Sequence, residues 1–173
     1  MSGPLPRIVR VHEVPPSGLT VPISATSEER AAIAAELDLV GLDRLAGTLT
    51  VRPQKRGFRV EGEIAADVVQ SCVVTLEPVA GSVRETIDVT YAPVDVRPAA
   101  AAAEIDVTVD ESDPPEPLEG NEIDVGALVL EHLVLGLDPY PRAPGATFEP
   151  PAETVEEPVR RSPFADLEKL RKR

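Results

Sequence analysis

Residues 58–68 alternate between two kinds of side chain, and this period of two limits the fold more than any other feature of the sequence. The first set is apolar or small and comprises Phe58, Val60, Gly62, Ile64, Ala66 and Val68. The second set lies between them and comprises Arg59, Glu61, Glu63, Ala65 and Asp67. Successive side chains of a strand point to opposite faces, so the pattern predicts a strand with one buried face.

Segments on both sides extend this sheet. A short apolar run at Leu49 and Val51 leads into residues 53–57, which predict a hairpin loop before the alternating strand. A second alternation predicts a return strand at about 82–92. Residues 71–80 interrupt the pattern, and we expect a turn or a short helical piece there because Pro78 lacks the amide that a ladder needs.

Two segments have the composition and the end signals of helices. Residues 27–39 are rich in alanine and follow Thr26, which has the glutamate of a capping box, Glu29, three positions later. Residues 122–136 are nearly all apolar, which predicts a largely buried helix with Asn121 as its cap.

Together these elements predict an α+β fold, in which an antiparallel β-sheet packs against two main helices. Short alternating runs add strands near 8–11 and 105–109, whereas we expect Pro22 to prevent ladder pairing at its position. The predicted domain spans residues 1–140 and contains an acidic linker at 93–121. Residues 141–173 are proline-rich and basic, and we expect an irregular C-terminal segment that ends in a short helix.

The net charge of −13 conceals a separation of charge along the chain. Residues 104–124, the acidic segment, hold nine acidic residues and no basic one, whereas residues 160–173, the basic tail, hold six basic and two acidic residues. A uniformly basic face for DNA or an anionic membrane is therefore not expected. With three Phe, two Tyr and no Trp, the chain also lacks the aromatics of a base-stacking platform.

A single cysteine, Cys72, means that the chain forms no internal disulfide and no zinc site from cysteines alone. No apolar run approaches the roughly 18 residues of a membrane helix, and the first residues lack the apolar stretch of a signal peptide. We therefore expect a reduced, cytoplasmic protein without a membrane anchor.

Three segments, taken in order, resemble the YceD family, whose members are described as large ribosomal RNA subunit accumulation proteins. The first is the glycine-containing strand that starts at Val60 and runs into the turn Ser71–Pro78. The second is the return strand that ends near Tyr91–Pro93, and the third is the helix that begins at Asn121–Gly126 and ends before Pro139. The resemblance covers roughly residues 27–145. Within the family, the chain is most similar to the alphaproteobacterial variant.

The resemblance implies a non-enzymatic ribosome-biogenesis factor that supports the accumulation of large-subunit (23S) ribosomal RNA. It marks one turn as a family motif, here called the elbow (residues 72–78), with the motif residues Cys72, Leu76, Glu77 and Pro78. Many members carry a second cysteine three positions after the first, where this chain has Thr75. The resemblance therefore gives no reason to expect a metal or another cofactor.

Two basic groups are the best candidates for contacts with RNA phosphates. The first surrounds the predicted hairpin loop and consists of Arg52, Lys55, Arg56 and Arg59. The second lies in the basic tail and consists of Arg160, Arg161, Lys169, Arg171, Lys172 and Arg173. The plainer interpretations are a solvated hairpin and a solubilising chain end.

Other functions stay open beside RNA binding. The acidic segment suits an adaptor that binds a basic ribosomal protein without touching RNA, or it is a solvated linker. Cys72 is either a reactive thiol or a small buried side chain, and no cationic residue lies near it in sequence to lower its pKa. Two histidines, His12 and His132, do not assemble a catalytic constellation, so we expect no enzyme. The expected partners are large-subunit ribosomal RNA or ribosomal proteins.

Overall fold

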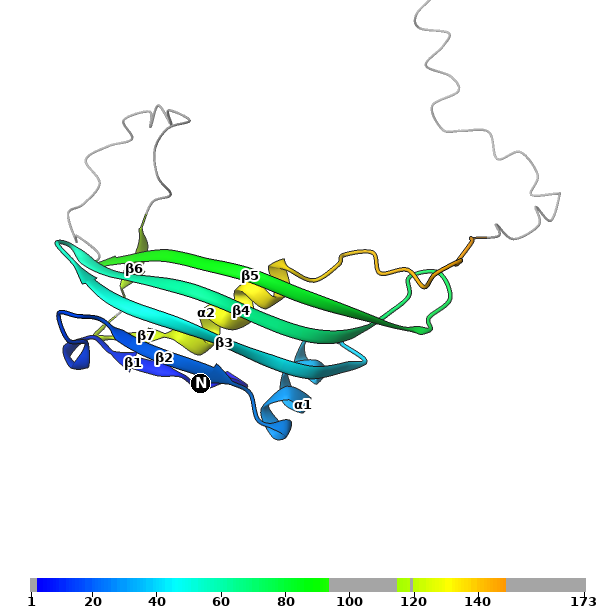
Figure 1. Cartoon of the computed structure of the whole chain (residues 1–173), viewed down its shortest axis with the longest axis horizontal. Coiled ribbons are helices and arrows are strands. Elements are labelled where there is room, and N and C mark those ends of the chain that lie inside the picture. Colours follow the sequence, from blue (N-terminus) through cyan, green and yellow to red (C-terminus); the bar gives the residue numbers. More distant parts are fainter. Residues whose placement is uncertain (1–2, 94–114, 119, 149–173) are drawn as a thin grey trace, which may run out of the picture.

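A computed structural model describes residues 3–93, 115–118 and 120–148 of the chain (Figure 1). The N-terminal half contains β1 (Ile8–Arg10), a 3-10 turn (Val11–Glu13), β2 (Leu19–Ser24), α1 (Ser27–Glu36) and β3 (Gly41–Gln54). The second half contains β4 (Gly57–Ser71), β5 (Pro78–Pro93), β6 (Glu116–Leu118), β7 (Glu122–Asp124) and α2 (Val125–Leu135). The predicted α+β class is confirmed by this set of elements.

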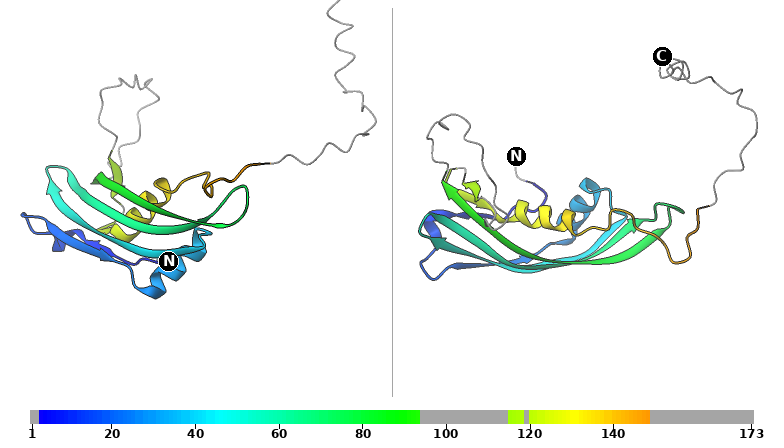
Figure 2. Two further views of the ribbon diagram at one scale, coloured as in Figure 1. Left: turned by 45° about the vertical axis from the view of Figure 1, so that its right-hand side comes forward. Right: turned by 90° about the horizontal axis from the view of Figure 1, so that it is seen from above.

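The main sheet has five strands in the order β2-β3-β4-β5-β6. Its centre is a meander of three long antiparallel strands, β3 to β5, whereas the short β6 pairs with the end of β5 in parallel. The sheet is therefore mixed, and the prediction of a purely antiparallel sheet is wrong at this edge. A separate two-stranded sheet joins β1 to β7. Figure 2 shows the long strands curving around α2, with both helices on the concave side.

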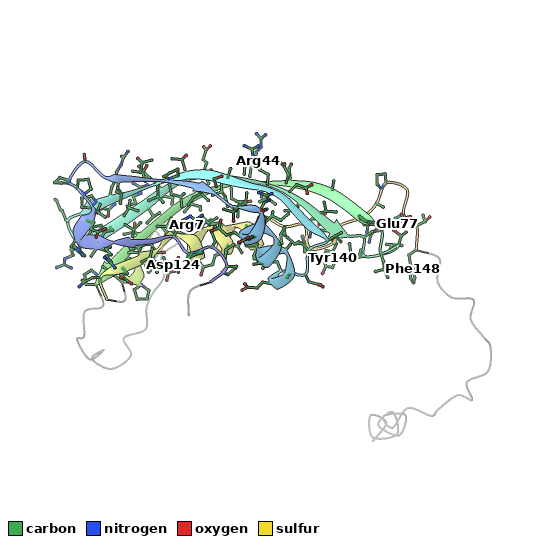
Figure 3. The ribbon with its side chains drawn as sticks, turned by 90° about the horizontal axis from the view of Figure 1, so that it is seen from below. Arg7, Arg44, Glu77, Asp124, Tyr140 and Phe148 are labelled. Atoms are coloured by element: carbon green, nitrogen blue, oxygen red, sulfur yellow. The ribbon has the colours of Figure 1, made fainter. Side chains whose placement is uncertain are left out.

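The buried face of the alternating strand is the one predicted. Val60, Ile64 and Val68 of β4 are at most 2% exposed, and Arg59, Glu63 and Asp67 face the opposite side of the sheet. The concave side of the sheet packs against α2 and the N-terminal segment. The core cluster includes Leu5, Val9, Ile33, Leu45, Leu49, Val51, Val83, Ile87, Ile123, Val125, Leu128, Val129 and Leu133. The opposite face is open, and Arg44 points away from the helices there (Figure 3).

Two glycines bring β3 and β4 closer together than side chains allow. A Cβ at Gly62 would collide with the carbonyl oxygen of Thr48, and one at Gly47 would collide with that of Glu63. Both collisions are with backbone atoms, which cannot move without disturbing the ladder. The close backbone approach that Gly62 predicts is therefore confirmed.

Two prolines pair within the sheet where we expected them to prevent pairing. Pro22 lies opposite Thr48 in β2, and Pro78 lies opposite Ser71 at the start of β5. β2 is an edge strand, so it pairs with β3 on one side and has no partner strand in the main sheet on the other. Pro78 is the first residue of its strand. Edge strands and first positions are the places where a sheet tolerates proline, so both predictions are wrong for the same reason.

The helices begin and end differently from the prediction. The capping box is confirmed, since the Glu29 amide donates to Thr26 Oγ1 and the Thr26 amide donates to Glu29 Oε2. However, α1 ends at Glu36 and is followed by Asp38 at a φ of 53°. The cap of α2 is Asp124, whose carboxylate accepts the Ala127 amide at 3.0 Å, and not Asn121.

The residues just before α2 explain this shift. Glu122–Asp124 pair with Ile8–Arg10 as β7, so the helix cannot begin until the strand has ended. The short strand predicted near 8–11 is thereby confirmed as β1. Residues 137–148 contain no helix or strand, as expected for this proline-rich stretch. The strand predicted at 105–109 and the terminal helix lie outside the described residues.

Candidate functional site

The first candidate region is the β3–β4 hairpin, which carries Arg52, Lys55, Arg56 and Arg59. Arg52 and Arg59 lie directly opposite each other in the ladder, and Gln54 pairs with Gly57 to close the loop. Like charges directly opposite in a sheet repel, so the two guanidinium groups need nearby carboxylates.

Neighbouring strands supply those carboxylates. Arg52 Nη1 lies 3.1 Å from Glu61 Oε1. Arg59 donates two hydrogen bonds to Asp88, at 2.7 Å and 2.6 Å, and its Nε is 3.8 Å from Glu61 Oε2. The hydrogen bonds from Arg59 lower the pKa of Asp88, and those to Asp88 raise the pKa of Arg59. Two of the four predicted phosphate contacts are therefore already paired with carboxylates.

Lys55 and Arg56, here called the hairpin tip, are different. Both side chains are exposed, and no carboxylate in the described part of the chain lies within ion-pair distance of either. Their charged groups are exposed to solvent at the end of a long hairpin. The hairpin tip is thus the part of the predicted group that is best placed for a phosphate contact.

The elbow lies at the other end of β4. β4 has fifteen residues, so at about 3.3 Å per residue the hairpin tip and the elbow are separated by up to about 45 Å. The elbow is closed by two backbone hydrogen bonds, from the Cys72 amide to the Glu77 carbonyl at 2.8 Å and from the Leu76 amide to the Cys72 carbonyl at 2.9 Å. The structure therefore keeps the two candidate regions apart.

Cys72 is the centre of the elbow. Its Sγ accepts backbone amides from Val74 and Thr75 at 3.4 Å, and from Ala143 at 3.3 Å. The thiol is fully buried, as the plainer interpretation predicts. The Thr75 side chain and these amides, led by that of Ala143, stabilise the thiolate and lower the pKa of Cys72 to about 6. No cation is among the causes of this shift; the Thr75 side chain and uncharged amide donors do here what cations do elsewhere.

The segment after α2 forms further hydrogen bonds with the elbow and with the end of β4, besides the one to the Cys72 thiol. The Val73 amide donates to the Pro141 carbonyl at 2.9 Å, and Gln70 Nε2 donates to the Asp138 carbonyl at 2.9 Å. These contacts join residues that are about 70 positions apart in sequence. Sequence reasoning could not find them, since no local pattern in residues 137–148 indicates a partner.

The elbow also exposes large apolar side chains. Leu76 is 77% exposed and has a φ of 61°, a left-handed conformation that costs energy in a leucine. Tyr140 and Phe148 are each 72% exposed, and Val73 is 48% exposed. Figure 3 shows Glu77, Tyr140 and Phe148 at the same end of the molecule. Exposed apolar groups that gather at one end of a domain are typical of a contact surface for another protein.

The remaining predicted residues either lie outside the described residues or do not form a cluster that could bind a metal. The six cations of the basic tail and most of the acidic segment lie outside the described residues. Within the described ranges, no group of three or more His, Cys, Asp and Glu side chains gathers to hold a metal. No described helix is long and apolar enough to cross a membrane.

Comparison with known proteins identifies the chain at the level of its family. Searches of curated proteins and of solved structures each give no match. The family model described as "Large ribosomal RNA subunit accumulation protein YceD" matches residues 60–171. The matched region begins in β4, includes the elbow and α2, and continues through most of the basic tail. Because it covers well over half of the sequence, the chain belongs to the YceD family, whose description assigns it a role in the accumulation of the large ribosomal RNA subunit.

Proposed function

We propose that this protein is a non-enzymatic, cytoplasmic ribosome-biogenesis factor that supports the accumulation of large-subunit ribosomal RNA by binding it. Membership of the YceD family carries the link to the large subunit. The hairpin tip, with two exposed cations that have no carboxylate partner among the described residues, is the observation that supports direct contact with RNA.

Two separated basic groups suit an acidic protein that binds RNA locally. The hairpin tip supplies two charges and the basic tail supplies six, whereas the rest of a chain of net charge −13 repels phosphate. Binding of this kind positions a protein on RNA without reading bases, because phosphate contacts carry no sequence information.

The hairpin allows a matched test of this proposal. K55Q/R56Q and R52Q/R59Q remove the same formal charge from one hairpin, but only the first pair lacks carboxylate partners within residues 3–93, 115–118 and 120–148. Each phosphate contact contributes about 0.7 to 0.9 to the slope of log affinity against log salt, so K55Q/R56Q is expected to reduce that slope by about 1.5. Fluorescence anisotropy with a large-subunit ribosomal RNA fragment measures it, and R52Q/R59Q is expected to change it clearly less.

A variant that ends at Val159 tests the basic tail in the same assay. Its loss of six cations is expected to reduce the slope by about 4 to 5. If neither this truncation nor K55Q/R56Q changes the affinity or its salt dependence, the direct RNA contact is wrong.

The exposed apolar side chains at the elbow end of the molecule favour a second candidate, a protein adaptor without direct RNA contact. Leu76, Tyr140 and Phe148 offer apolar area, and the strained backbone of Leu76 holds that side chain in solvent. An adaptor of this net charge suits a basic ribosomal protein. A pull-down at low salt with and without RNase separates the two candidates, since only a protein-mediated association survives RNase.

A further inference from the structure

The helix α2 has more apolar surface than the sheet covers. Val125, Leu128 and Leu133 are buried against the core, yet Val134 is 46% exposed and Leu135 is 79% exposed on the remaining side. With α1 these residues form a groove, here called the α1–α2 groove, of about 490 Å³. It is lined by Pro4, Ile33, Glu36, Leu37, Leu130, Glu131, Val134 and Leu135. Six of these eight lining residues are apolar.

In the described part of the chain, two carboxylates are the only charged side chains that line the α1–α2 groove. Glu36 lies at the end of α1 and Glu131 lies in α2, and both are exposed. No cation in the described ranges forms an ion pair with either of them. The groove therefore suits a segment that combines apolar side chains with positive charge.

The chain contains one segment of that kind. We propose that the basic tail docks in the α1–α2 groove of its own chain, with Phe164, Leu167 and Leu170 against the apolar lining and its cations near Glu36 and Glu131. The three apolar residues are spaced three apart in the sequence, a spacing that would place them on one side of a helix in the docked state. The tail carries six basic and two acidic residues, so its charge is opposite to that of the groove.

Chain length and the family match agree with this occupant. The description of the chain stops at Phe148, and the fifteen residues from 149 to 163 can span about 50 Å when extended. That span is at least the length of β4, up to about 45 Å, so the linker is long enough to cross the domain from Phe148. The family model extends to residue 171, so the apolar residues of the tail belong to the matched region. The acidic segment is an unsuitable occupant, because its nine carboxylates would meet Glu36 and Glu131.

Docking would give the basic tail two states. In the docked state its apolar residues are withdrawn from other partners, and release of the tail makes them available. A short linker gives a tethered segment an effective concentration in the millimolar range, so an intrinsic dissociation constant of about 100 µM leaves the groove about 90% occupied. The inference goes beyond the RNA-binding proposal and is tested without RNA.

The absence of tryptophan from the chain provides the probe. In the full chain carrying F164W, that tryptophan is the only one, and its fluorescence reports on its surroundings. We expect quenching by acrylamide to be several-fold weaker than in a peptide of residues 160–173 that carries the same substitution. Adding L135K, which changes a side chain that is 79% exposed and leaves the core intact, places a positive charge where the cations of the tail would dock and is expected to restore the quenching of the peptide.

The matched control is L76K, which places the same charge at a leucine that is 77% exposed and outside the groove. It is expected to leave the quenching unchanged, and thermal melts confirm that both double variants are folded. Quenching equal to that of the peptide, or shielding that survives L135K, would overturn the proposal. Shielding that disappears on dilution from about 100 to 1 µM would also overturn it, because a tethered segment at millimolar effective concentration is insensitive to dilution and a second copy is not.

Discussion

Replacement of Gly62 by alanine tests the central geometry of the sheet. A Cβ at this position meets the carbonyl oxygen of Thr48 and the backbone and side chain of Leu49 on the neighbouring strand. Neither backbone atom can move without shifting the β3–β4 ladder, whose pairs continue on both sides of Gly62. Overpacking of this kind costs about 1–3 kcal/mol, and the obstacle here is backbone, so we expect about 2–3 kcal/mol.

Gly81 provides a control of identical chemistry. A Cβ there meets only Val68 Cγ2, at 3.5 Å, which is an ordinary contact. Alanine at Gly81 is therefore expected to be neutral or to stabilise by up to about 1 kcal/mol, because it restricts the unfolded chain. The two variants separate a steric effect from the general consequence of replacing glycine in a strand.

Thermal unfolding followed by circular dichroism measures the difference. For a domain of this size, 1 kcal/mol shifts Tm by about 3–5 °C, so Gly62→Ala is expected to lower Tm by about 10 °C and Gly81→Ala to change it little. If the two melting temperatures agreed to within about 2 °C, the close approach of β3 and β4 at Gly62 would be refuted.

Three further predictions concern single groups. Thr26→Ala removes one half of the capping box and is expected to cost about 1 kcal/mol, measured by urea unfolding; no loss would mean that the box adds nothing to α1. The pKa of Cys72 is about 6 in the folded protein against an ordinary 9.0, so its thiolate contributes stability that is complete above pH 9 and is lost as pH falls through 6. The stability difference between the reduced wild type and Cys72→Ser is expected to grow from pH 6 to pH 9, and a constant difference would contradict the amide contacts. Burial, with smaller contributions from Glu131, Glu116 and Asp124, raises the pKa of Tyr91 to about 12. Alkaline absorbance titration is expected to show a phenol with that midpoint, which Tyr91→Phe removes.

Period-two alternation was sufficient to predict the centre of the sheet. β4 extends over the whole alternating stretch and its buried face is the one that the apolar residues mark. The start of β3 was harder, because the pairing register shifts between Leu42 and Arg44 and the shift breaks the alternation. β7 could not be predicted at all, since Glu122–Asp124 form a strand only by pairing with β1, more than 100 residues earlier.

The candidate site was predictable as a set of residues but not as a set of interactions. The sequence places Arg52 and Arg59 beside the hairpin loop, yet the carboxylates that pair with them become neighbours only through strand register. The lowered pKa of Cys72 comes first from the Thr75 side chain, three residues away, and then from the Ala143 amide, which is 71 residues away and approaches the thiol only in the folded chain. Tertiary contacts of this range leave no local signature in the sequence, and so both effects required the folded chain.

Direct contact between this protein and large-subunit ribosomal RNA is the central proposal. Ultraviolet crosslinking of the full chain to RNA in cells, followed by mass spectrometry of the crosslinked peptides, detects that contact. We expect adducts of large-subunit ribosomal RNA on peptides that contain Lys55 and Arg56 or residues 160–173. Recovery of the protein with large-subunit particles but without an RNA adduct on either segment would contradict it.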